Sequence, residues 1–211
     1  MTARRRGRRS VFAAGFAAGA LAVPALLALP TALLAGCTTS SGNAVAGQNY
    51  QAGDGSITIL APDQRKAPGE LRGTTVEGRQ VDLASYRGST VVLNVWGSWC
   101  GPCQKEAPAL QAASEALAPK GVKFLGINIR EDGNRARAAA FERAYGITYP
   151  SLFDSTGYLL ALRGVVAANA VPSTVIVDAQ GRIAARISGQ TTKDTLVDVV
   201  DDVLSGKVPA Q

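Results

Sequence analysis

The stretch Trp96-Gly97-Ser98-Trp99-Cys100-Gly101-Pro102-Cys103 carries two cysteines at the junction of two predicted elements. Residues 90–96, just before it, form a β-branched apolar run that suits a buried strand. Residues 102–118 have helical character and stop before Pro119. A Cys-X-X-Cys pair is only moderately informative by itself. One that follows a buried strand and opens a helix predicts a redox-active dithiol.

The spacing of the two cysteines suits thiol chemistry. Cys100 falls at the predicted amino terminus of the helix, where unpaired N–H groups and the positive end of the helix dipole favour a thiolate and lower its pKa. Cys103 lies one turn further along, so we expect it to be less exposed and to resolve the mixed disulfide that Cys100 forms. Pro102 fits the first helical turn, where its missing N–H would be unpaired anyway.

The composition excludes most alternative roles for the cysteine pair. The chain has three cysteines and no histidine, which rules out Ser-His-Asp and Cys-His catalysis, zinc or haem bound by histidine, and a four-cysteine zinc site. Attachment of a c-type haem needs a histidine after the second cysteine, and Gln104 stands there. A structural disulfide across four residues would constrain little chain. We therefore predict redox catalysis without a cofactor and without a metal site.

The cysteine motif resembles the active site of the thioredoxin family, and its inner pair Gly-Pro is the same. The pattern Cys103-x-x-Glu106-x-Pro108 is similar to that of the membrane-tethered TlpA/ResA/DsbE-like branch. This resemblance implies that the carboxyl group of Glu106 lies under the dithiol and exchanges protons with the cysteines, although most helix glutamates are merely solvated. Asn94 stands where ordinary thioredoxins carry a buried aspartate, and an amide cannot titrate.

The resemblance also identifies a second part of the site. It implies that the bond between Val171 and Pro172 is cis and packs beside the dithiol, while the backbone of Val171 pairs with the substrate chain. An X-Pro bond is cis in only about 5–6% of folded cases, so the sequence alone favours trans. The substrate-facing surface is expected to include Trp99, Gly101 and Pro102 as well.

The remaining sequence alternates between strand and helix signals. Residues 74–76 and 79–83 predict a small hairpin. Further strands are predicted at residues 122–129, 175–178 and 182–188, and helices at residues 134–145 and 191–204. This order predicts an α/β fold with a mixed central sheet flanked by helices. The resemblance, which covers roughly residues 73–204, implies the thioredoxin fold with an N-terminal β-hairpin extension.

The amino-terminal segment has the features of a targeting sequence. Five arginines within residues 4–9 precede an uncharged apolar run at residues 11–35, which ends in Leu34-Ala35-Gly36-Cys37. This order resembles a bacterial lipoprotein signal, which implies cleavage before Cys37 and acylation of its thiol. The alternative is an uncleaved transmembrane helix, since the run is long enough to span a bilayer.

The predicted organisation has three parts. They are a lipoprotein-type signal peptide at residues 1–36, a lipidated cysteine with a flexible Ser/Thr/Gly-rich tether at residues 37–56, and a thioredoxin-like domain at residues 57–211. The five arginines account for most of the formal net charge of +6. The rest of the chain is nearly neutral, so its charge gives no reason to expect nucleic-acid binding.

These features predict a thiol–disulfide oxidoreductase anchored by lipid to the extracytoplasmic side of the cell membrane. Its expected partners are exported proteins with thiols or disulfides, apocytochrome c being one that the resemblance implies, and a membrane protein that donates or accepts electrons. The Gly-Pro pair favours a reductase, with an oxidase of the same fold as the alternative. A thiol peroxidase is disfavoured because Gly97 stands where peroxiredoxins carry Thr or Ser. A non-catalytic binding module or holdase would keep the fold without needing the dithiol.

Overall fold

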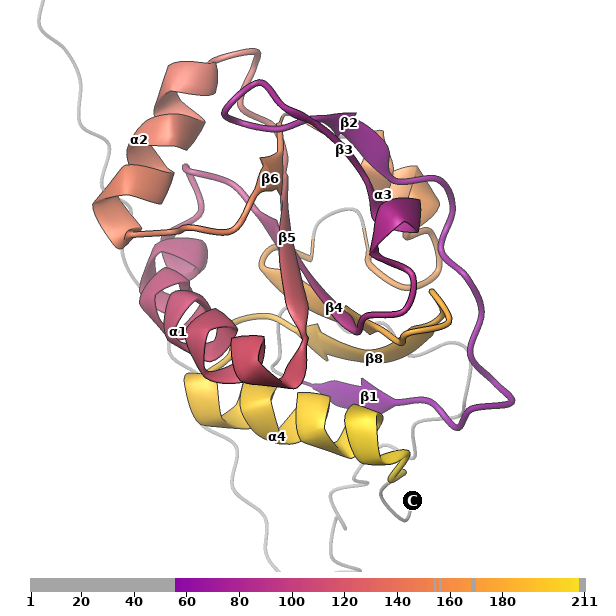
Figure 1. Ribbon diagram of the computed structural model, residues 1–211. Helices are drawn as coiled ribbons and strands as arrows, with labels where there is room; N and C mark the ends of the chain where they lie inside the picture. Colours follow the sequence, from indigo (N-terminus) through magenta and orange to yellow (C-terminus); the bar gives the residue numbers. More distant parts are fainter. Residues whose placement is uncertain (1–55, 154, 156, 168–169, 209–211) are drawn as a thin grey trace, which may run out of the picture. The chain divides into compact units, whose positions relative to one another are not determined.

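The apolar run ahead of the dithiol forms the central strand of a mixed sheet, as the sequence predicts (Figure 1). The computed structural model describes residues 56–153, 155, 157–167 and 170–208. Within these ranges no helix is both long enough and apolar enough to cross a membrane. The predicted signal peptide and Cys37 lie outside the described residues.

The described residues form eight strands, four α-helices and two 3-10 helices. The strands are β1 (Ile57–Ile59), β2 (Arg72–Thr74), β3 (Gln80–Asp82), β4 (Val91–Trp96), β5 (Lys123–Asn128), β6 (Ser151–Leu152), β7 (Ser173–Val177) and β8 (Ile183–Ser188). The α-helices are α1 (Gly101–Leu117), α2 (Arg135–Tyr145), α3 (Tyr158–Ala161) and α4 (Lys193–Ser205), and the 3-10 helices are η1 (Leu83–Tyr86) and η2 (Ala118–Lys120).

The sheet is built around β4, which has neighbours on both edges. Its strand order is β1-β8-β7-β4-β5-β6. β4 pairs in parallel with β5 and antiparallel with β7, and all six of its residues are buried. A strand covered on both faces needs apolar residues throughout. Asn94 is the one polar residue of β4, and its side chain hydrogen-bonds to Glu106 and Thr174 beside the dithiol.

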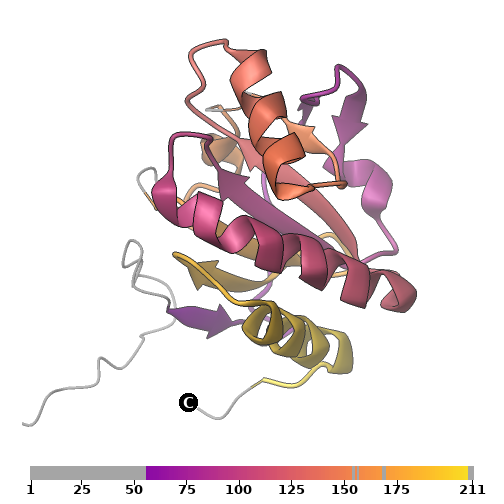
Figure 2. The same ribbon diagram turned by 90° about the vertical axis from the view of Figure 1, so that its left-hand side faces the viewer.

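Helices cover one face of the sheet, and loops with short helices cover the other (Figures 1 and 2). On the first face α1 and α4 lie side by side, and their Leu117 and Leu196 pack with Val92 of β4. On the second face Leu93 packs with Leu162, which follows α3. Successive residues of β4 therefore contribute to opposite cores, as the two-residue period of a strand requires.

The predicted hairpin is present, but its strands are shifted. β2 and β3 pair outside the main sheet, and residues 75–79 form the connection. The predicted first strand, residues 74–76, lies too late in the chain because it includes part of this turn. Gly78 adopts a positive φ of 86° there, and its N–H donates to the carbonyl of Thr75. Thr75 also bridges Leu152, so the hairpin turn covers the outer edge of β6.

Two described strands and one described α-helix are absent from the sequence prediction. β1 and β6 have three and two residues, and α3 has four, too few for an alternating or helical period to show. β1 extends the sheet by pairing antiparallel with β8. The positions of the longer elements agree with the prediction to within a few residues.

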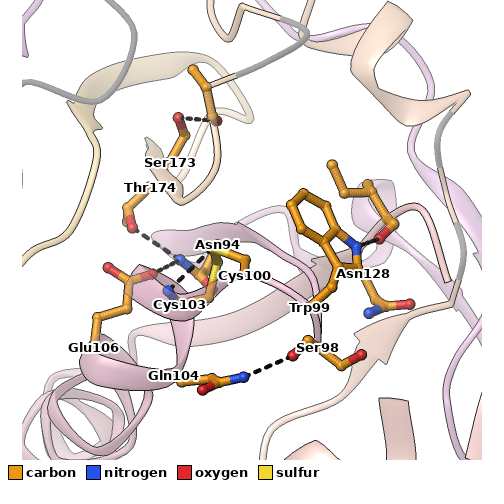
Figure 3. The surroundings of a disulfide bond; sticks show 12 residues. Asn94, Ser98, Trp99, Cys100, Cys103, Gln104, Glu106, Asn128, Ser173 and Thr174 are labelled. Carbon is orange, nitrogen blue, oxygen red and sulfur yellow. Dashed lines mark hydrogen bonds between the residues drawn. A yellow bond between two sulfur atoms is a disulfide. The ribbon is translucent and has the colours of Figure 1, made fainter. Parts of the chain in front are cut away.

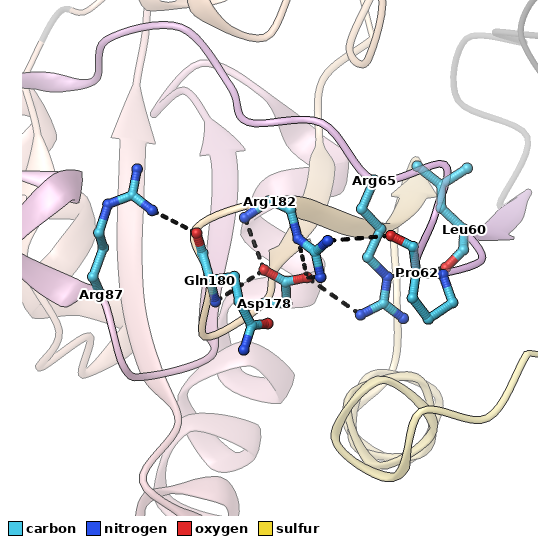
Figure 4. A network of polar contacts seen from close by, with 7 residues as sticks. All are labelled: Leu60, Pro62, Arg65, Arg87, Asp178, Gln180 and Arg182. Carbon is cyan, nitrogen blue, oxygen red and sulfur yellow. Dashed lines mark hydrogen bonds and ion pairs between the residues drawn. The ribbon is translucent and has the colours of Figure 1, made fainter.

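At the end of the sheet reached by the β7–β8 turn, a buried carboxyl group holds two segments together (Figure 4). Asp178 accepts hydrogen bonds from the N–H groups of Gln180 and Arg182 at 3.1 and 2.8 Å. Its other oxygen pairs with the guanidinium groups of Arg182 and Arg65. Burial alone would raise the pKa of Asp178, but the contacts with Arg182 and Arg65 outweigh it and hold that pKa below its ordinary value of 3.8.

Replacing Asp178 by Asn should lower the free energy of unfolding by about 1–3 kcal/mol near neutral pH, because charged hydrogen bonds are lost. A lowered pKa stabilises the folded state above the unfolded-state value, and that stabilisation disappears as the pH falls through the folded-state pKa. The difference between wild type and variant should therefore shrink below about pH 4. Urea unfolding at neutral and acidic pH measures it. The half-exposed Asp201, paired with Lys120, is the control, and Asp201→Asn should change the free energy of unfolding by less than about 1 kcal/mol.

Candidate active site

The two cysteines lie at the junction between β4 and α1, as the sequence predicts (Figure 3). Cys100 is the N-cap residue of α1, and its Sγ accepts a hydrogen bond from the N–H of Cys103 at 3.2 Å. The two sulfur atoms form a disulfide, with the Cα atoms 5.2 Å apart. Cys100 is 4% exposed and Cys103 1%, so the order of accessibility is the predicted one. The helix continues through Pro108 to Leu117.

A tight turn carries the chain from β4 to the first cysteine. The N–H of Cys100 donates to the carbonyl of Gly97 at 3.1 Å, and the side chain of Gln104 donates to the carbonyl of Ser98 at 3.0 Å. Trp99 is 45% exposed, and its indole N–H donates to the carbonyl of Ile129 at 3.2 Å. The turn is therefore tied to α1 on one side and to the end of β5 on the other.

The indole of Trp99 also explains why residue 97 is a glycine. A Cβ atom added to Gly97 would lie 2.5 Å from Nε1 of Trp99, far closer than real contacts allow. A threonine or serine at this position, as in the peroxidase alternative, would displace the indole. The geometry therefore agrees with the sequence in disfavouring a thiol peroxidase.

Glu106 lies on the buried side of α1, three residues after Cys103, and is 1% exposed. Its two oxygens accept hydrogen bonds from the side-chain amide of Asn94 at 3.0 Å and from the N–H of Thr191 at 3.1 Å. Asn94 donates as well to the hydroxyl of Thr174, at 3.3 Å. One amide on β4 thus joins the helix of the dithiol to β7 (Figure 3).

The segment before β7 has the predicted conformation. The peptide bond between Val171 and Pro172 is cis. Val171 packs against the buried cluster that contains both cysteines, which brings this loop to the dithiol. The carbonyl of Pro172 accepts a hydrogen bond from the N–H of Gly189 at 2.9 Å, and the hydroxyl of Ser173 donates to the carbonyl of Ala170 at 2.7 Å.

Beneath the dithiol, aromatic rings close the core. Trp96 is buried and stacks on Phe141 of α2, with ring centroids 4.4 Å apart. A small cavity of about 10 Å³ is lined by Cys103, Asn94 and Tyr149 among others. On the outer side, a groove of about 390 Å³ runs between the turn of the dithiol and α2. Its lining consists of Ser98, Trp99, Gln104, Arg137, Ala140, Phe141, Ala144 and Tyr145.

The described structure thus brings the predicted residues of the dithiol, the glutamate and the cis proline to one place. The predicted lipid-bearing residue, Cys37, is not among the described residues. Sequence patterns missed Thr174 and Thr191, whose contacts depend on pairing between distant elements. They also missed Glu131, which binds Ser98. Within the described ranges, no three or more His, Cys, Asp or Glu side chains are grouped so that they could hold a metal ion.

Comparisons with known proteins agree with this geometry. The family model described as AhpC/TSA family matches residues 63–186. The chain belongs to the AhpC/TSA family. Its relatives include the thiol-disulfide oxidoreductase ResA of Geobacillus thermodenitrificans, which is 30% identical over 128 residues that cover 61% of this chain and 71% of that protein.

Solved structures place this member of the AhpC/TSA family among the ResA- and DsbE-like proteins with a thioredoxin fold. A DsbF homologue from Corynebacterium diphtheriae is 35% identical with a TM-score of 0.64, and the match covers 74% of this chain and 98% of that one. A secreted thiol-disulfide isomerase from Corynebacterium glutamicum is 31% identical with a TM-score of 0.63, covering 72% and 94%. The predicted fold and enzyme class are confirmed: the protein is a thiol–disulfide oxidoreductase.

The electrostatics of this oxidoreductase's site centre on Glu106. Burial raises the pKa of its carboxyl group from 4.5 to about 7, against the opposing effect of the hydrogen bonds from Asn94 and Thr191. Near neutral pH the group is therefore divided between its neutral and charged forms. The neighbouring Tyr149 is buried, and its burial together with the charge of Glu106 raises the pKa of its hydroxyl.

Glu106→Gln should reveal this raised pKa as a change in stability. The carboxyl group binds its proton more tightly in the folded protein, so it stabilises the fold below its ordinary pKa of 4.5, and that contribution is lost as the pH rises through about 7. The variant should gain up to about 3 kcal/mol relative to wild type between about pH 4 and pH 8. Urea unfolding of the oxidised proteins measures the gain.

The matched control is Glu115→Gln, an exposed glutamate on the same helix. The effect of the buried site is the pH dependence of the Glu106 variant that remains after the difference shown by this control is subtracted. If nothing remains, the carboxyl group of Glu106 does not titrate near neutral pH in the folded protein.

Proposed function

We propose that the protein reduces disulfides of exported proteins through the dithiol Cys100-Gly101-Pro102-Cys103. The observation that carries this proposal is the position of Cys100, which caps α1 with its sulfur accepting the N–H of Cys103. A thiolate at this place is stabilised by that N–H and by the positive end of the helix dipole.

The reaction begins with attack of the Cys100 thiolate on one sulfur of a substrate disulfide. The substrate bond breaks, a mixed disulfide forms, and the other substrate sulfur leaves as a thiolate. Cys103 then loses its proton and attacks the Cys100 sulfur, which releases the second substrate thiol. Two electrons pass to the substrate, and the enzyme keeps the Cys100–Cys103 disulfide present in the structure. A membrane protein of matching dithiol chemistry would restore the reduced form.

Glu106 is the proposed proton acceptor for Cys103. It lies on the same helix one turn away, and burial raises the pKa of its carboxyl group to about 7, near the value that suits proton exchange at neutral pH. Asn94 cannot take this role because an amide does not titrate, but its hydrogen bond fixes the orientation of the carboxyl group.

Substrate contact is proposed for the surface around the dithiol. Trp99, Gly101 and Pro102 stand on its helix side and Val171 on the side of the cis Pro172. The backbone of Val171 would pair with an extended substrate chain. The groove between Trp99 and α2 extends this surface. Exported proteins, including the haem-attachment thiols of apocytochrome c, are the proposed substrates.

The proposed direction of electron flow, from the enzyme to the substrate, rests on the Gly-Pro pair between the cysteines. The Gly-Pro pair accompanies a potential of about −270 mV in thioredoxin, against about −120 mV in the oxidant DsbA. Equilibration of the full protein with glutathione buffers should give a midpoint below about −240 mV. A midpoint above about −160 mV would favour the oxidase instead. Cys103→Ser is the control, and it should form a mixed disulfide with glutathione where wild type forms its internal one.

A non-catalytic holdase of the same fold would not need the two cysteines, and this separates it from the oxidoreductase. If the double variant Cys100→Ser, Cys103→Ser supports the protein's role in cells as well as wild type does, the redox proposal fails. The thiol peroxidase is disfavoured by the packing of Trp99 on Gly97.

The proposed location is the extracytoplasmic face of the cell membrane, with Cys37 as the lipid-bearing residue. Support comes from the order of the arginines, the apolar run and Leu34-Ala35-Gly36-Cys37, and from the similarity to a secreted isomerase. A single acyl chain binds membranes only marginally, whereas two or more give stable attachment.

Cys37→Ser should therefore abolish acylation. Mass spectrometry of the amino terminus measures it: wild type should begin at an acylated Cys37, and the variant should carry no lipid. Cys103→Ser, which leaves the signal intact, should be acylated like wild type. A wild-type protein that keeps residues 1–36 and carries no lipid would instead support an uncleaved transmembrane segment.

A further inference from the structure

A second buried carboxyl group, in contact with the turn that leads to the dithiol, takes no part in the proposed mechanism. Glu131 follows β5 and is 0% exposed. One of its oxygens accepts hydrogen bonds from the backbone N–H of Ser98 at 2.7 Å and from the side-chain amide of Asn128 at 3.0 Å. Its other oxygen contacts the hydroxyl of Ser98 at 2.8 Å. Both hydrogen-bond donors of Ser98, its backbone N–H and its hydroxyl, thus bind this one carboxyl group.

The backbone around Glu131 is held in an uncommon form. Arg130 and Asp132, on either side of it, have φ values of 56° and 53°, in the left-handed region that residues other than glycine rarely adopt. They are the two non-glycine residues with positive φ in the part of the chain that the structure describes. Such conformations persist where surrounding contacts enforce them, and they gather at functional sites.

The contacts of Glu131 reach the nucleophile through two residues. Ser98 is fixed by Glu131 and, through its carbonyl, by Gln104 of α1. The next residue, Trp99, hydrogen-bonds to Ile129 in the same loop as Glu131, and Cys100 follows directly. Loss of the bonds between Glu131 and Ser98 would therefore leave the turn that presents the Cys100 sulfur held by fewer contacts and able to move together with the indole of Trp99.

We propose that Glu131 is a positioning residue, which acts through its hydrogen bonds to Ser98 to hold Trp99 and Cys100 in the geometry for attack on a substrate disulfide. The proposal deepens the proposed function and rests on it for the catalytic readout. Misplacement of a reacting group by about 1 Å can cost a hundredfold in rate, so loss of this support should be visible in the reaction.

The experiment compares Glu131→Ala with the near-isosteric Glu131→Gln in the full protein. An amide at position 131 can still accept from the N–H of Ser98 with its oxygen and donate to the hydroxyl with its nitrogen, but it carries no charge. Two quantities are measured at a temperature where all variants are folded. They are the acrylamide quenching of tryptophan fluorescence in the oxidised protein and the rate constant for reduction of insulin disulfides by the reduced protein. Quenching reports Trp99, because Trp96 is only 3% exposed.

We expect Glu131→Ala to increase quenching and to lower the rate constant about tenfold or more, while Glu131→Gln stays within about twofold of wild type in both. The matched control is Asp178→Asn, which replaces a buried carboxyl group at the other end of the sheet. Asp178 follows Val177, which pairs with Val91 at the start of β4, whereas the dithiol follows the end of β4. It should lower stability without changing either readout. A purely structural role of Glu131 would make Glu131→Ala behave like this control.

The proposal is overturned if Glu131→Ala keeps the wild-type quenching and rate, or if Glu131→Gln is as defective as Glu131→Ala, since the charge would then be what matters. Should Glu131→Ala fail to fold, Ser98→Ala removes the hydroxyl contact alone. A smaller change in the same direction supports the proposal, and unchanged quenching overturns it. If wild type does not reduce insulin, the proposed function fails, and quenching still decides the role of Glu131.

Discussion

The site depends on the complete burial of β4. This strand is paired along both edges and covered on both faces, so its end is fixed in space to a degree that a surface strand could not match. The turn at residues 97–100 and the first residues of α1 continue directly from it. The capping of α1 by Cys100 then follows from chain continuity, and no separate element has to bring the sulfur to the helix amino terminus.

Two buried carboxyl groups contact the surroundings of the dithiol and differ in their partners. Glu106 accepts hydrogen bonds from Asn94 and Thr191, and its burial raises its pKa to about 7. Glu131 accepts hydrogen bonds from both donors of one residue of the turn, Ser98. The first arrangement suits a group that gains and loses a proton. The second joins the loop after β5 to the turn that carries Cys100.

Much of the fold could be predicted from the sequence because its main signals are local. The apolar run of β4, the helix after Pro102 and the later strands and helices each show a period or a boundary residue. The cis bond before Pro172 and the burial of Glu106 could be predicted only from the family resemblance. For Glu106, the 3.6-residue period places it on the same helix face as Cys103 but does not show that this face is buried. Thr174, Thr191 and Glu131 could not be found this way. Their contacts form only when strands distant in sequence pair, and a short strand such as β6 leaves no periodic trace.

The turn of the β2–β3 hairpin lies against β6 through Thr75, and this has a consequence for solubility. An open sheet edge offers unpaired N–H and carbonyl groups to any extended polypeptide, which leads to strand addition and aggregation. Here one outer strand has two residues with the hairpin turn bridged to it, and the other outer strand, β1, has three. An enzyme proposed to meet incompletely folded chains would be exposed to such pairing at every encounter. The shortness of both edge strands, and the hairpin turn bridged to β6, limit strand addition at the two edges of the sheet.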